Sequence, residues 1–176
     1  QSLKDLLIEK GVDQKKIFVL PNAVDQTKFN LVAKDKQLEA ELDFENKVVI
    51  GYIGSFVNYE GLDLLLEACA ILKEKHGDIF RILLVGDGDT MHSLRRTTRF
   101  LQLEDVVTFA GRVPHDEVQK YYSLIDIAPL PRRGLRVCEL VSPLKPFEAM
   151  GSGKVLITSS VKALAEIVDD GNTGLI

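Results

Sequence analysis

Short apolar segments alternate with segments of helical pattern along most of this sequence. The clearest apolar segments are residues 48–54, 80–85, 106–110, 125–130 and 155–158. Helices are expected over residues 34–42, 62–75, 90–101, 116–124 and 163–168. Strands that are apolar throughout are typical of a parallel sheet with helices on both faces. The sequence therefore predicts an α/β fold of three layers around a mostly parallel sheet.

Glycine follows three of the expected strands, at Gly54, Gly86 and Gly111. Ligands of parallel sheets bind at the carboxyl ends of the strands, so these glycines lie on the expected binding edge. A glycine there either lets a ligand approach the backbone or serves only as a turn residue, and both interpretations remain open. The pattern is no dinucleotide fingerprint, because Met91 stands where a third glycine would follow Gly86 and Gly88.

Residues 142–154 carry the most specific chemical signal. Ser142, Pro143 and Leu144 form a turn before an expected helix start at Lys145, and Glu148 follows about one helical turn later. Free N–H groups at a helix start attract phosphate, a lysine adds positive charge, and a carboxylate accepts hydrogen bonds from sugar hydroxyls. The segment is typical of a cradle for a nucleoside diphosphate, although an ordinary junction between loop and helix has the same pattern.

Charged residues around this segment are further candidates. Arg132, Arg133 and Arg136 are placed either to meet an anion or to lie in solvent. Glu139 and Glu148 form a carboxylate pair, which serves as acid and base or divides into one hydroxyl-binding group and one solvated group.

Charge and composition exclude several classes of protein. The net charge is −4 and no basic stripe is present, so nucleic acid is not an expected partner. The apolar runs are too short to cross a bilayer, and no signal peptide is recognised. Cys69 and Cys138 give neither a disulfide framework nor a metal-binding spacing. We expect no metal, no cofactor and a cytoplasmic location, with contact to the inner face of the membrane left open.

Several segments, taken in order, resemble the donor-binding C-terminal half of group 1 glycosyltransferases with the GT-B fold. They include Pro-Asn-Ala-Val-Asp at residues 21–25 and Leu-Lys-Pro-Phe-Glu-Ala-Met at residues 144–150. The matching segments are residues 19–29, 50–68, 84–88, 107–113, 122–127, 142–150 and 165–175. Each is unspecific alone, but together they follow the family's order. The resemblance implies a Rossmann-like domain over residues 16–176, cut at its C-terminal end, with residues 1–15 as the tail of the preceding half or a linker.

The resemblance also assigns roles to residues. Glu148 would hold the ribose, the backbone of Leu144 and Lys145 would meet the diphosphate, and Gly54 would let the phosphates approach. Lys145 and Glu148 are therefore the predicted catalytic residues. The main chain of Arg112 and Val113 would contact the base. The other predicted substrate-binding residues are Ser55, Gly86, Glu139, Ser142 and Pro143.

The chain departs from the family's pattern at three positions. The family usually has an arginine and a lysine where this chain has Ser55 and Glu60. The first glutamate of the family's paired motif falls at Leu140, and Glu139 lies one residue earlier. Two phosphate-binding cations are therefore missing. Either Lys145, together with one arginine of the group Arg132, Arg133 and Arg136, replaces them, or the donor is held in a different way.

The implied function is transfer of a hexose from a UDP- or GDP-linked sugar to a saccharide or lipid-linked acceptor, as in polysaccharide biosynthesis. The chain would supply the donor-binding half, would pair with the N-terminal acceptor-binding half of the same protein, and would be inactive alone. Catalysis would come from N–H groups and cations that neutralise the departing diphosphate. Two alternatives remain: a sugar-nucleotide epimerase of the same fold, and a non-catalytic flavodoxin-like binding module.

Overall fold

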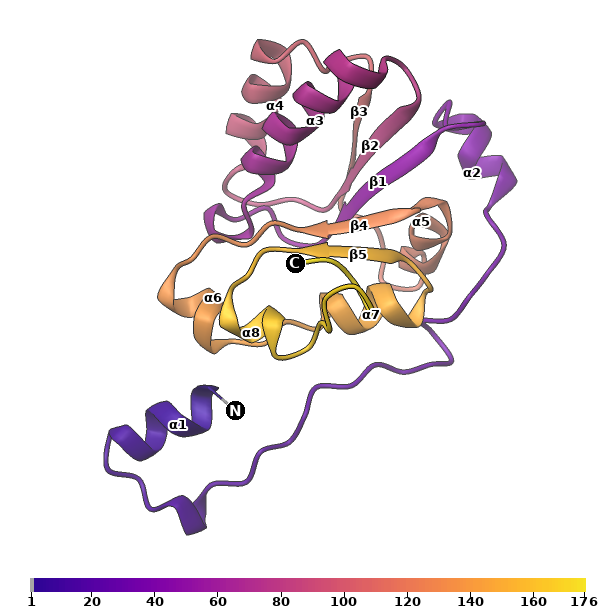
Figure 1. Ribbon diagram of the computed structural model, residues 1–176. Coiled ribbons are helices and arrows are strands. Elements are labelled where there is room, and N and C mark those ends of the chain that lie inside the picture. Colours follow the sequence, from indigo (N-terminus) through magenta and orange to yellow (C-terminus); the bar gives the residue numbers. More distant parts are fainter. Residues whose placement is uncertain (1) are drawn as a thin grey trace.

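The computed structural model describes residues 2–176 and contains one parallel sheet of five strands (Figure 1). The strands are β1 (Val48–Ile53), β2 (Phe80–Val85), β3 (Val107–Gly111), β4 (Ile127–Leu130) and β5 (Val155–Thr158). Their order across the sheet is β3-β2-β1-β4-β5, and every pairing is parallel. The predicted α/β fold with a parallel sheet is confirmed, and each strand falls on one of the expected apolar segments.

Eight α-helices are found in the described residues. They are α1 (Ser2–Glu9), α2 (Lys36–Glu41), α3 (Leu62–His76), α4 (Met91–Phe100), α5 (Val118–Leu124), α6 (Arg136–Leu140), α7 (Lys145–Gly151) and α8 (Lys162–Ala165). The chain moves outward from β1 to β3 and then returns past β1 to β4, so right-handed crossovers place α3 and α4 on one face and α5 and α7 on the other (Figure 1).

Burial explains why the central strands β1 and β2 are mostly apolar. All six residues of β2 are buried, as are the four central residues of β1. The amphipathic helix α3 turns Leu62, Leu65, Leu66 and Cys69 into the core. Cys69 is therefore a core residue, and burial raises the pKa of its thiol to about 12.

The structure differs from the expected elements in the second half of the chain. Helix α6 was not expected, because its five residues are too few to show a helical period. Helix α8 ends at Ala165, earlier than expected. Beyond α8 the chain forms two isolated bridges, between Ile157 and Leu175 and between Asp170 and Gly174, and no further strand is found in the described residues.

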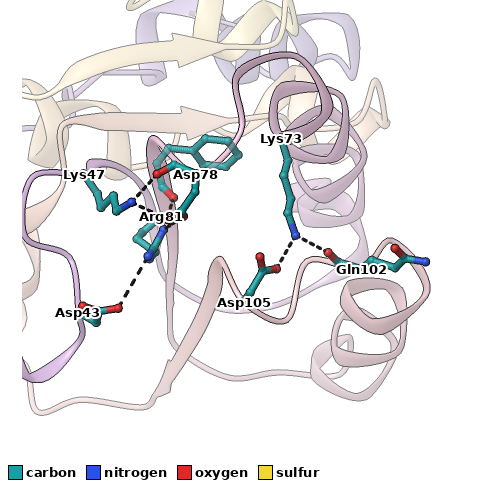
Figure 2. Close-up of polar contacts among 8 residues, drawn as sticks. Asp43, Lys47, Lys73, Asp78, Arg81, Gln102 and Asp105 are labelled. Atoms are coloured by element: carbon teal, nitrogen blue, oxygen red, sulfur yellow. Dashed lines mark hydrogen bonds and ion pairs between the residues drawn. The ribbon is translucent and has the colours of Figure 1, made fainter.

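Ion pairs join the connections at the amino edge of the sheet (Figure 2). Lys47 Nζ donates to Asp78 Oδ2 at 2.7 Å, and Arg81 also donates to the Asp78 carboxylate. Nearby, Lys73 Nζ lies 2.5 Å from Asp105 Oδ1. The hydrogen bonds from Lys47 and Arg81 lower the pKa of Asp78 to about 2. Lys47, Asp78 and Asp105 precede β1, β2 and β3, so these pairs lie at the edge opposite the predicted binding site and bear on stability.

Candidate functional site

The strand order reverses between β1 and β4, and the carboxyl ends of these two strands form the ligand-binding crevice of sheets of this type. Gly54 follows β1 there, and Lys145 reaches the same point from the start of α7. A Cβ atom at Gly54 would lie 2.3 Å from Lys145 Cε. The absent side chain of Gly54 therefore makes room for Lys145, and both predicted residues meet at the switch point.

Lys145 is held at this place by two neighbours. Its Nζ atom lies 3.3 Å from Glu60 Oε1 and 5.5 Å from the centroid of the Tyr52 ring. Tyr52 is fixed in turn, because its hydroxyl donates to the carbonyl oxygen of Ser55 at 3.1 Å. The Lys145 side chain remains 20% exposed, whereas the Glu60 side chain beside it is 2% exposed.

Glu60 and Arg132 form a buried ion pair beside Lys145. Arg132 donates from Nη2 to Glu60 Oε1 at 2.8 Å and from Nε to Glu60 Oε2 at 3.4 Å. Burial would raise the pKa of Glu60, but the hydrogen bond from Arg132 and the charge of Lys145 outweigh burial and lower it. The pKa of Arg132 is raised by Glu60 despite its own burial. The cluster of Glu60, Arg132 and Lys145 thus contains one carboxylate and two cations.

The three arginines predicted as anion-binding candidates have different surroundings. Arg132 is buried, and its Nη1 atom also donates to the Val141 carbonyl oxygen at 3.1 Å. Arg133 pairs with Asp63 on α3. Arg136 is exposed at the start of α6. The three arginines therefore do not form one cationic cluster.

The two predicted carboxylates also have separate partners. Glu148 Oε2 accepts a hydrogen bond from the Tyr122 hydroxyl at 3.0 Å. Burial and the charge of Glu148 raise the pKa of Tyr122 well above its usual value. Glu139 Oε2 accepts from the backbone N–H of Lys162 at 2.7 Å, at the start of α8. Glu139 therefore joins α6 to α8, whereas Glu148 lies on α7 together with Lys145.

The remaining predicted residues follow the strands or precede α7. Ser55 and Arg112 are exposed, Val113 is half-buried, and Pro143 is buried. The exposed residues Ser142 and Leu144 precede α7, and the Ser142 carbonyl accepts from Asn22 Nδ2 at 2.9 Å. The predicted contacts of these residues with a substrate stay predictions.

Neighbouring protein atoms, and not a ligand, explain why residue 86 is a glycine. A Cβ atom there would lie 1.9 Å from the carbonyl oxygen of Gly54. The loop after β1 and the loop after β2 are therefore in direct backbone contact, which supports the carboxyl edge from within.

Sequence reasoning missed the contacts that hold the functional side chains. Glu60 and Arg132 are 72 residues apart, and Tyr122 and Glu148 are 26 residues apart. The first pair is brought together by the neighbouring positions of β1 and β4, which require the strand order. No local pattern marks either contact.

Other features of the described residues do not coincide with this edge. A cavity of about 480 Å³ lies between α1, residues 17–22, α6 and α8. No group of three or more His, Cys, Asp or Glu side chains in residues 2–176 is arranged to hold a metal ion. Within the same residues, no helix has the length and apolar character needed to cross a membrane.

Comparison with known proteins finds glycosyltransferases among the relatives of this chain. The amylovoran biosynthesis glycosyltransferase AmsK of Erwinia amylovora is 27% identical over 169 residues, which cover 96% of this chain and 40% of AmsK. The D-inositol 3-phosphate glycosyltransferase of Corynebacterium aurimucosum is 30% identical over 136 residues, which cover 73% of this chain and 30% of that protein. This chain thus spans less than half the length of these relatives.

Solved structures share the fold. HepE of Anabaena, in complex with UDP-glucose, matches with a TM-score of 0.81 and 21% identity over 98% of this chain and 46% of HepE. The C-terminal domain of the group 1 glycosyl transferase LpcC of Francisella tularensis matches with a TM-score of 0.72 and 20% identity, over 87% of this chain and 78% of that domain.

The family model described as "Glycosyl transferases group 1" matches residues 47–176, which include the whole sheet and the Glu60, Arg132 and Lys145 cluster. With the five-stranded parallel sheet and its likeness to GT-B glycosyltransferases, this match settles the family. The chain belongs to the group 1 glycosyltransferases and has the Rossmann-like fold of their C-terminal GT-B domain.

Proposed function

We propose that the carboxyl edge around Gly54 and Lys145 binds the diphosphate of a nucleotide sugar, and that the longer protein transfers the sugar to a saccharide or lipid-linked acceptor. The observation that carries the proposal is the position of Lys145. Its side chain is 20% exposed and lies at the switch point of the sheet, in a cluster with one more cation than anions. Likeness to HepE, whose structure contains UDP-glucose, favours a UDP-linked donor.

The chemistry follows from the charge that develops on the leaving group. When the bond between sugar and diphosphate breaks, negative charge grows on the departing phosphate oxygen. A cation already in place stabilises that charge in the transition state. Lys145 supplies this cation. Glu148, three positions later in the same helix, accepts hydrogen bonds from the ribose hydroxyls while Tyr122 orients its carboxylate.

Calorimetric titration with UDP tests the proposal. A charged hydrogen-bonding partner contributes about 1.5–3 kcal/mol, so Lys145→Ala should weaken UDP binding about tenfold or more. Arg136→Ala serves as the control, because Arg136 is an exposed cation on the neighbouring α6. Lys145→Ala with an unchanged dissociation constant, within about twofold, would overturn the proposal.

A further inference from the structure

We propose that Glu60 is an internal counterion that holds Lys145 until an anion binds, and that Arg132 keeps Glu60 paired when Lys145 turns to the ligand. Glu60 and Arg132 are thus positioning residues that set the affinity of the site without touching the ligand. The inference rests on the proposed function and adds a means by which that site is tuned.

The first argument comes from how two cations share one carboxylate. Arg132 contacts both oxygens of Glu60, at 2.8 and 3.4 Å, whereas Lys145 contacts only Oε1, at 3.3 Å. Hydrogen bonds from arginine to both oxygens of a carboxylate are the stronger and more specific arrangement. If Lys145 leaves, Glu60 therefore keeps a charged partner on each of its oxygens.

The second argument comes from burial and flexibility. Glu60 is 2% exposed and the Arg132 side chain 8% exposed, whereas the Lys145 side chain is 20% exposed. Arg132 is also tied to the Val141 carbonyl oxygen. Lysine has a flexible stem with a rotatable ammonium group, while the guanidinium fork is rigid. Lys145 is therefore the member of the cluster that is free to turn toward a phosphate.

The consequence is a competition for one ammonium group. The Glu60 carboxylate and an incoming phosphate both attract Lys145 Nζ, so Glu60 weakens anion binding. Arg132 reduces the hold of Glu60 on Lys145, so Arg132 strengthens anion binding indirectly. Substitutions at the two residues should therefore act in opposite directions. If the buried pair were only structural, both substitutions would weaken binding.

Calorimetric titration with UDP and, separately, with inorganic pyrophosphate tests this prediction. We expect Glu60→Gln to tighten the binding of both anions roughly tenfold and Arg132→Gln to weaken it roughly tenfold. In a Lys145→Ala background, Glu60→Gln should change affinity by less than about twofold, because the group under competition is gone. Circular dichroism of each variant establishes that it is folded.

The possible results of these titrations separate the inference about Glu60 from the proposed function. Glu60→Gln that weakens binding, or that has the same effect with and without Lys145, overturns the inference and leaves the proposed function standing. Binding of pyrophosphate without binding of UDP contradicts the nucleotide function and leaves the inference to be judged with pyrophosphate. Native protein that binds neither anion overturns both.

A second measurement covers the case in which Arg132→Gln does not fold. The side-chain ammonium signal of Lys145 can be followed by NMR in the native protein during titration with pyrophosphate. We expect that signal to shift as the ammonium exchanges Glu60 for phosphate. A Lys145 signal that does not change at saturating pyrophosphate overturns the inference.

Discussion

Replacement of Gly86 by alanine tests the backbone contact that supports the carboxyl edge. Gly86 has a φ of +136°, and an added Cβ atom would lie 1.9 Å from the carbonyl oxygen of Gly54 and 3.2 Å from Phe56 Cε1. The first of these atoms belongs to the backbone, so no side-chain rotation relieves the clash. Either the loop after β1 moves or the loop after β2 does.

Two costs add up in this variant. A residue with a side chain held in a sparsely populated backbone region costs about 1–3 kcal/mol. Overpacking that forces the backbone to shift costs about 1–3 kcal/mol more. We therefore expect Gly86→Ala to lower the free energy of unfolding by about 3 kcal/mol, which for a chain of this size is a fall in Tm of about 6–12 °C.

The matched control is Gly77→Ala. Gly77 also has a positive φ, +66°, but nothing lies within 4 Å of its added Cβ atom, and it follows α3 at the amino edge. Its variant bears only the backbone cost, so Tm should fall by about half as much or less. Thermal denaturation followed by circular dichroism measures both. An equal fall in Tm for the two variants would refute the argument from the Gly54 contact. Because that contact supports the loop beside Lys145, Gly86→Ala should also weaken UDP binding, while Gly77→Ala should not.

Three further predictions concern the carboxylates and the activity of the chain. Glu148→Gln should weaken UDP binding about tenfold, since charged hydrogen bonds contribute about 1.5–3 kcal/mol. Glu139→Gln should change UDP binding little, because Glu139 accepts a hydrogen bond at the start of α8. Equal losses of affinity in calorimetry would show that the roles of the two carboxylates are wrongly assigned. Lys47 and Arg81 lower the pKa of Asp78 from 3.8 to about 2, so the contribution of Asp78 to stability is present above about pH 4 and is lost as the pH falls toward 2. In urea denaturation at different pH values, the free energy of unfolding of Asp78→Asn should therefore fall less steeply in acid than that of the native protein. An equal fall in both proteins would contradict this prediction. The chain alone should bind UDP but transfer no sugar, because the longer relatives have further residues that it does not span; acceptor glycosylation by this chain in a radiolabel assay would contradict that expectation.

The sheet was predictable because each strand is mostly apolar and is separated from the next by a connection of clear pattern. β2 shows the reason: with neighbours on both sides and helices on both faces, all of its positions are buried, and its sequence has no polar alternation. Elements of four or five residues such as α6 and α8 were missed or misplaced, because so short a segment shows little more than one helical turn.

The candidate site was predictable only in part. Lys145 and Glu148 stand out because they lie in one short segment with proline and a turn before it, and that pattern is visible locally. Their partners are not local. Tyr122 reaches Glu148 from α5, and Glu60 reaches Lys145 from the connection between β1 and α3. Sequence spacing alone could not assign those contacts, because they depend on the order of the strands.

Glu60 stands where the family usually has a lysine, and its carboxylate also changes the surroundings of the cations that remain. From the sequence, Ser55 and Glu60 count as two absent phosphate-binding cations. In the structure, Glu60 is a buried anion that accepts hydrogen bonds from Arg132 on both carboxylate oxygens and from Lys145 on one of them. Arg132 is consequently turned inward, where only 8% of its side chain is exposed. The positive charge that this cluster presents to a ligand is therefore that of Lys145, and we infer that the affinity for a diphosphate depends on how firmly Glu60 holds that one ammonium group.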